Sequence, residues 1–157
     1  MPNFLAQFSL GLVPHHPDLN ALSNDLLPFA QRMLAEFGEF LPFGGKITAD
    51  GEHVSVGAKG SSEPSKSKEL IDIMTETFRR EAAEGKIRAA GICFDVRVVP
   101  PGQVDKTDAI ELSLEREGGD AVEVFVPYAL LPDGEVTYGD MFASTRTPTM
   151  FVQPQKT

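Results

Sequence analysis

A cysteine, an aspartate and an arginine alternate along one stretch of the sequence, at Cys93, Asp95 and Arg97. If this stretch is a β-strand, the three side chains share one face of the sheet. A thiolate at Cys93 becomes a nucleophile when a base lies nearby, and His53 is the candidate base. A small residue that fills a half-buried sheet face explains Cys93 equally well. The residues therefore leave open a small hydrolase that uses Cys93 with His53 and Asp95, and no catalytic residue is assigned.

Two adjacent histidines stand between prolines in GLVPHHPD, residues 11–18. Together with Asp18 and His53, they make a transition-metal site conceivable. Adjacent side chains in an extended, proline-flanked segment point in different directions, however, whereas metal sites need ligands that converge. We therefore predict that His15 and His16 belong to a solvated loop before the first helix and bind no metal. The sequence indicates no cofactor.

Carboxylates recur on what the alternation predicts to be the solvated face of the sheet, at Asp95, Glu111, Glu115 and Glu123. Two of them at a suitable separation would serve as the acid and base of a glycosidase, or would bind a hard cation. Glutamates at alternate positions are also typical of a sheet face in water, where Arg97 would pair with one of them across strands. We favour the solvated face, because the chain has no compact Asp/Glu cluster such as a calcium loop.

The period of the apolar residues predicts the elements that hold these side chains. Helices are expected at 23–37 and 66–84, and strands at 39–48, 52–58, 87–99, 108–117, 121–130 and 135–143. This order predicts an α+β fold: two layers, with a mainly antiparallel sheet of five or six strands and two helices on one face. We expect a single domain over 1–157, with an irregular N-terminal arm at about 1–20 and an irregular C-terminal tail at about 145–157.

Charge and cysteine content limit the kinds of partner and site that we expect for this protein. The formal net charge is −9, with 14 basic residues against 23 acidic ones, so binding to nucleic acid or to an anionic membrane is not expected. One cysteine excludes an internal disulfide and a cysteine-based zinc cluster. The N-terminal residues lack the positive segment of a secretory signal, and no apolar run reaches the roughly 18 residues of a membrane helix. We therefore expect a soluble cytoplasmic protein.

Four segments together resemble a family of small uncharacterised bacterial proteins, over about residues 36–130. They are FLPFGGKITADGEHVSVGA, EGKIRAAGICFDVRVVPPG, DAIELSLEREGG and VEVFVPYAL. The resemblance implies a bacterial, cytoplasmic, single-domain protein. It carries over no activity and no site residues.

Common enzyme signatures are missing from the sequence: it has no phosphate loop, no dinucleotide fingerprint, no nucleophile elbow and no zinc-protease helix. We therefore favour a non-enzymatic module that binds another protein or regulates one. Self-association is also predicted, because small residues around Gly91 and Cys93 would leave a hollow on the sheet, with Phe125 at its rim and Arg97 beyond it. Such a hollow would receive an identical surface in a homodimer. The alternative is a monomer in which the tail at 147–154 folds over the hollow.

Overall fold

The computed structural model describes residues 16–57, 67–119 and 121–152. The helices are α2 (Pro17–Phe37) and α3 (Ser67–Ala83), and the strands are β1 (Phe43–Thr48), β2 (His53–Val56), β3 (Ile87–Val98), β4 (Thr107–Arg116), β5 (Ala121–Leu130), β6 (Val136–Tyr138) and β7 (Phe142–Thr145). Neither of these helices is long and apolar enough to cross a bilayer. Most of the predicted N-terminal arm, His15 included, lies outside the described residues, as does the end of the predicted tail.

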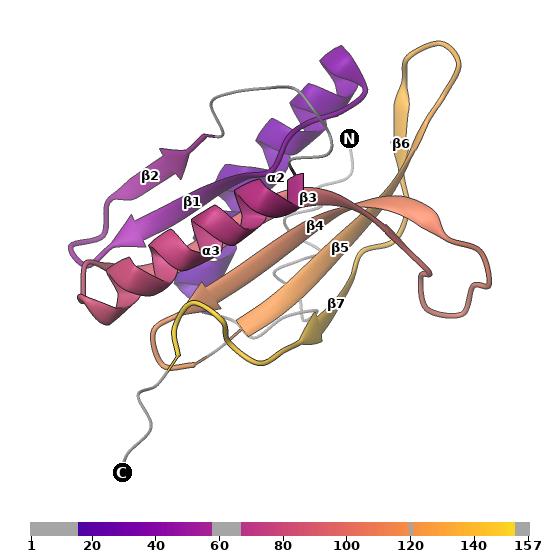
Figure 1. Cartoon of the computed structure of the whole chain (residues 1–157). Coiled ribbons are helices and arrows are strands. Elements are labelled where there is room, and N and C mark those ends of the chain that lie inside the picture. Colours follow the sequence, from indigo (N-terminus) through magenta and orange to yellow (C-terminus); the bar gives the residue numbers. More distant parts are fainter. Residues whose placement is uncertain (1–15, 58–66, 120, 153–157) are drawn as a thin grey trace.

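The strands form one antiparallel sheet in the order β2-β1-β3-β4-β5-β6, and β7 pairs with β5 beyond the end of β6 (Figure 1). The predicted α+β class with a mainly antiparallel sheet is confirmed. The sheet has seven strands, of which six follow one continuous order. The hairpin predicted at Asp50-Gly51 joins β1 to β2, and Gly51 takes the positive φ of 97° that such turns require.

The helices lie on opposite faces of the sheet, α2 behind the strands and α3 in front of them (Figure 1). This corrects the predicted arrangement of two layers with both helices on one face. The physical reason is visible in β3, which is apolar on both sides along its first half: Ile92 packs under α3, and Cys93 packs under α2. A strand that is apolar on both faces needs cover on both.

The close approach of α2 depends on the small residues of β3. Leu26 of α2 comes so near to Gly91 that a Cβ atom there would lie 3.0 Å from the leucine Cδ1. The leucine stripe of α2 continues on either side of this contact and is buried against β1, β3 and β4. Burying each leucine fully contributes about 1.5–3 kcal/mol, so this interface is a principal source of stability.

The helix α2 begins at Pro17, well before the predicted start at residue 23. His16 is its N-cap, and the Nδ1 atom of His16 accepts a hydrogen bond from the backbone N–H of Asp18 at 3.1 Å. Pro17 suits the first helical position because its missing N–H has no partner there in any helix. Pro28 lies inside the helix on its exposed side, where water can satisfy the carbonyl that loses a partner.

The helix α3 packs mainly against β3 and β1, where Met74 and Phe78 are buried. It therefore leaves part of the same sheet face without a helix. We call this part the open sheet face; its residues are Phe94 of β3, Glu111 and Ser113 of β4, Glu123 and Phe125 of β5, and Phe142 of β7. The chain after β7, residues 146–152, crosses one end of this face, and we call it the strap.

Candidate functional site

The structure does not bring Cys93 and His53 together. Cys93 is completely buried beneath α2, and burial raises the pKa of its thiol well above the ordinary value. His53 lies on β2, two strands away, where its Nδ1 atom is 2.7 Å from Oδ2 of Asp25. The strand register places the two residues about 13 Å apart along the strands and about 10 Å apart across them. The arrangement therefore gives the thiol neither a base nor access to a substrate.

Asp95 and Arg97 lie further along β3, beyond the part of the strand that α2 buries. The hydroxyl of Tyr128 donates a hydrogen bond of 2.8 Å to Oδ1 of Asp95. Burial raises the pKa of Asp95, and the hydrogen bond from Tyr128 opposes that rise. Arg97 is exposed, with its Nε atom 3.8 Å from a carboxylate oxygen of Asp108. These contacts link β3 to β4 and β5 at the end of the sheet.

The hollow predicted for a homodimer is filled by the protein itself. Gly91 and Cys93 are buried under α2, and Leu26 takes the space beside Gly91. Phe125 lies on the opposite face of the sheet, because its partner in the register is Glu111, whereas Cys93 pairs with Leu112. The predicted surface of Gly91, Cys93 and Phe125 therefore does not exist, although self-association through another surface stays a prediction.

The carboxylates predicted on one face are divided between two. Glu111, Glu115 and Glu123 face the side of α3, and Asp95 faces the side of α2. The first two are not solvated: Glu111 is 9% exposed and Glu115 is 0% exposed. In the described part of the chain, no group of three or more His, Cys, Asp or Glu side chains could hold a metal ion.

Glu115 holds the strap against the sheet. Its carboxylate accepts hydrogen bonds from three successive backbone N–H groups, those of Thr149, Met150 and Phe151, at 2.9–3.2 Å. Burial alone would raise the pKa of Glu115, but these N–H groups, with the charge of Arg146, outweigh it and lower the pKa. The carboxylate is thus ionised and fully satisfied, which assigns it a structural role.

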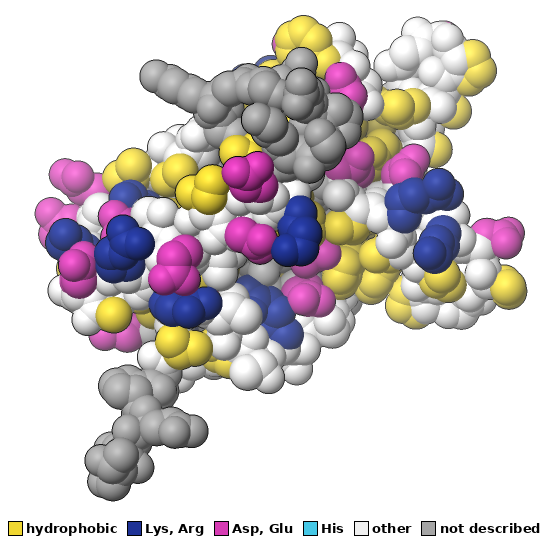
Figure 2. All heavy atoms as spheres, in the orientation of Figure 1, with side chains coloured by type: hydrophobic (Ala, Val, Ile, Leu, Met, Phe, Trp, Pro, Cys, Tyr) yellow, Lys and Arg dark blue, Asp and Glu magenta, His cyan; other side chains and the backbone are white. Residues whose placement is uncertain are grey.

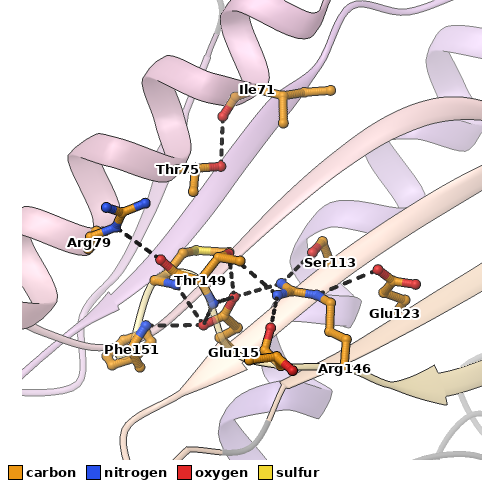
Figure 3. A network of polar contacts seen from close by, with 11 residues as sticks. Ile71, Thr75, Arg79, Ser113, Glu115, Glu123, Arg146, Thr149 and Phe151 are labelled. Atoms are coloured by element: carbon orange, nitrogen blue, oxygen red, sulfur yellow. Dashed lines mark hydrogen bonds and ion pairs between the residues drawn. The ribbon is translucent and has the colours of Figure 1, made fainter. Parts of the chain in front are cut away.

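Arg146 connects the strap to the open sheet face. Its guanidinium nitrogen Nη2 lies 2.7 Å from Oε2 of Glu115 and donates a 2.6 Å hydrogen bond to the hydroxyl of Ser113. Its Nε atom lies 3.7 Å from a carboxylate oxygen of Glu123. Figure 3 shows Arg146 between these residues, with α3 above them. The charge of Arg146 is therefore already engaged by the strap's own anchor.

Glu111 differs from Glu115 because no hydrogen bond or ion pair with a described residue compensates its burial. In the described residues, its carboxylate accepts no hydrogen bond and forms no ion pair, although the side chain is nine-tenths buried. Burial, and to a lesser extent the negative charge of Glu123, raise its pKa from 4.5 to about 7, and Arg146 opposes the rise. Near neutral pH this carboxyl group exchanges readily between its two charge states.

Glu111 lines a cavity of about 220 Å³ between α3, the open sheet face and the strap. The other lining residues are Ile71, Thr75, Ile92, Phe94, Ser113, Glu123, Arg146, Thr149 and Met150. A cavity that combines apolar walls with a few convergent polar groups and a carboxyl group of perturbed pKa is the usual form of a binding site. We take this cavity and the adjoining open sheet face as the candidate site.

A larger cavity, of about 520 Å³, adjoins the other end of the open sheet face, where Pro127 and Phe142 belong to its wall. Its lining contains one charged residue, Asp140, and is otherwise made of prolines, aromatic residues, small residues and neutral polar groups. Phe125 and Phe142 are stacked between the two cavities, with ring centroids 4.9 Å apart and an interplanar angle of 15°. The two cavities and the stacked pair therefore form one extended surface.

Glu111 and Phe125 were both candidates from the sequence, but their surroundings differ from those predicted. Glu111 was predicted on a solvated face, because Glu111, Ser113 and Glu115 alternate with apolar residues as solvated residues do. The sequence signal that was available is the apolar Phe94, which a cross-strand register would bring beside Glu111. The comparisons with protein-family models, with curated proteins and with solved structures find no match. The resemblance to small bacterial proteins therefore stays a prediction.

Proposed function

We propose that the protein is a non-enzymatic protein-binding module and that the open sheet face is its binding surface. The observation that carries the proposal is the stacked pair of Phe125 and Phe142, which is only partly buried and lies between two cavities. Figure 2 shows hydrophobic side chains gathered beside α3, next to acidic ones. Partly exposed aromatic groups at the centre of a surface with a polar rim are typical of protein interfaces.

The shape of the surface favours an extended ligand. A segment of a partner protein that lies along β5 would contact the stacked rings in its middle and place a side chain in each cavity. Aromatic rings suit this role because they bury a large area for little loss of side-chain freedom. A regulatory role would follow from reversible binding of this kind.

The rival proposal, a hydrolase built on Cys93 with His53 and Asp95, gains no support from the geometry, because the thiol lies under α2 without a base. A second copy of the chain is the alternative partner for the open sheet face. We also propose a cytosolic location, because the one cysteine is a buried free thiol, which suits a reducing compartment.

A displayed library of random peptides tests the proposal. We expect the wild-type protein to enrich peptides whose binding is lost in Phe125→Thr and retained in Ile73→Thr, which removes an exposed apolar residue of α3 outside the two cavities. Circular dichroism checks that both variants are folded. Peptides that bind both variants equally, or a library that enriches none, would contradict the proposal. Sedimentation at several concentrations, repeated with Phe125→Thr, distinguishes a second copy of the chain from a foreign partner.

A further inference from the structure

The cavity at the strap contains a buried carboxyl group that the fold leaves without a partner. Glu115, four residues further along β4, accepts hydrogen bonds from three backbone N–H groups and pairs with Arg146, whereas Glu111 has no hydrogen bond or ion pair with the described residues. Glu111 is 9% exposed and lines the cavity. Leaving such a group buried and unpaired costs free energy, which an arriving hydrogen-bond donor would recover.

Aromatic rings stand on both sides of Glu111 across the sheet. The register pairs Phe94 of β3 with Glu111, and Glu111 with Phe125 of β5. Directly opposed residues on one face have Cβ atoms about 4.5–5.5 Å apart, so Phe94 and Phe125 are the cross-strand neighbours of Glu111. Phe94 also lines the cavity itself. A carboxylate between aromatic rings suits a cation that is delocalised and weakly hydrated.

The other charges around the cavity leave this role to Glu111. Glu123 of β5 and Arg146 of the strap are the remaining charged residues in the lining, while α3 and β3 contribute Ile71, Thr75, Ile92 and Phe94. Arg146 is held by Glu115 at 2.7 Å and by Ser113 at 2.6 Å. Counting Glu111 as ionised, the lining residues carry an excess of negative charge, which favours a cationic ligand.

We propose that this cavity receives an arginine side chain of the partner protein, with Glu111 as its counter-ion and Phe94 of the lining beside the guanidinium group, while Phe125 neighbours Glu111 on the adjacent strand. The proposal rests on the proposed function, of which it names the recognised group. The cavity volume of about 220 Å³ is smaller than the usual 300–1,000 Å³ of small-molecule sites and is of the size that one long side chain requires. Arginine suits it better than lysine, because a planar guanidinium group stacks on rings and pairs with a carboxylate through two hydrogen bonds.

Binding of a cation at this place is coupled to a proton. The pKa of Glu111 is about 7 in the unoccupied protein, and a guanidinium group beside the carboxylate lowers it. The arginine side chain therefore binds the ionised form, and a proton leaves when the protein is protonated. Since roughly a tenth of the carboxyl groups are ionised at pH 6 and roughly nine-tenths at pH 8, affinity is about tenfold higher at pH 8.

Carbon-13 NMR of the full chain with labelled glutamate measures this directly. The Cδ resonance of Glu111 is assigned by its loss in Glu111→Gln, and N-acetyl-arginine amide is the probe. N-acetyl-citrulline amide has nearly the same shape without the charge, and N-acetyl-lysine amide has the charge without the planar group. We expect the arginine compound to shift the Glu111 resonance, to lower its apparent pKa by about two units or more, and to bind about tenfold more tightly at pH 8 than at pH 6.

The citrulline compound should leave Glu111 unchanged, and Glu117→Gln, which replaces an exposed carboxylate outside the cavity, should retain binding. An unperturbed Glu111 resonance at saturating probe, equal binding of the citrulline compound, or tighter binding of the lysine compound would overturn the proposal. The peptide selection separates the two ideas. If the selected peptides depend on Phe125 but contain no arginine, the protein-binding function is supported and the arginine proposal is overturned. If the arginine compound binds but no Phe125-dependent peptide is selected, the arginine site is supported and the protein-binding function is contradicted.

Discussion

Glu111→Gln is expected to remove a pH dependence of stability between pH 5 and pH 8. The pKa of this carboxyl group is 4.5 in its ordinary state and about 7 in the folded protein, mainly because it is buried. Between these two values the folded protein binds more protons than the unfolded chain, so the free energy of unfolding decreases as the pH rises. The stabilising contribution of the raised pKa is fully present below about pH 4.5 and is lost as the pH rises through about 7.

The size of the effect follows from the same shift. At about 1.36 kcal/mol per pKa unit, the rise from 4.5 to about 7 corresponds to roughly 3.4 kcal/mol, of which about 2.5 kcal/mol falls between pH 5 and pH 8. Glutamine has nearly the same shape and does not ionise in this range. Its own burial has a cost that is the same at each pH, and this cost cancels when the variant and the wild type are compared at two pH values.

Urea unfolding followed by circular dichroism at pH 5, 6, 7 and 8 measures the effect. Relative to the wild type, Glu111→Gln should be more stable at pH 8 than at pH 5 by about 2.5 kcal/mol. Glu117→Gln is the matched control, and it should change this difference much less, because Glu117 is exposed in the turn between β4 and β5. Parallel stability curves for the wild type and Glu111→Gln would refute the reasoning, since they would mean that Glu111 titrates equally in both states.

Four further predictions concern the strap and the core. Glu115→Gln should lower the free energy of unfolding by about 3–5 kcal/mol above pH 5, since it removes the nearer counter-ion of the mostly buried Arg146 and leaves only Glu123 at 3.7 Å. Glu123→Gln should cost less than about 1 kcal/mol, and urea unfolding of both variants measures the difference. The stability that Glu115 contributes should also be lost as the pH falls below the ordinary pKa of a glutamate, because the pKa of Glu115 is lowered in the folded protein. Gly44→Ala should destabilise the protein by more than about 1 kcal/mol, because the new Cβ would lie 2.8 Å from a backbone oxygen. Gly57→Ala is the control, since a Cβ there would meet open space. Equal thermal midpoints of the two variants would contradict this prediction. Cys93 should react with a thiol reagent only when the protein unfolds, and rapid stoichiometric reaction of the native protein would show that the site is open.

Much of the fold was accessible from local patterns. Alternation located the long strands, and the tight turn at Asp50-Gly51 set the first hairpin. The missed feature was the second covered face of the sheet. Ala89, Gly91 and Cys93 were interpreted as an open hollow, but small residues on a strand also occur where a helix packs closely, and Leu26 does so here. The start of α2 was missed because Pro17 was read as part of an extended segment.

The candidate site was harder to predict, because its parts meet only in three dimensions. Glu111 and Glu115 lie on the same face of one strand, four residues apart, and the sequence around them gives no reason to distinguish them. They differ because Glu115 lies under the strap, whose N–H groups come from residues 149–151, while Glu111 lies beyond its edge. Which carboxylate is satisfied and which is left for a ligand therefore depends on tertiary structure.

The lengths of the strands bear on how the protein avoids aggregation. The three strands at the centre of the described sheet are long and apolar, and pairing with another molecule along such a strand is a recognised route to fibrils. At the two edges stand only short strands, β2 on one side and β6 with β7 on the other, and the break between β6 and β7 interrupts the second edge. Short, interrupted edges offer a poor template to an approaching chain, so the arrangement protects the central strands from edge-to-edge association.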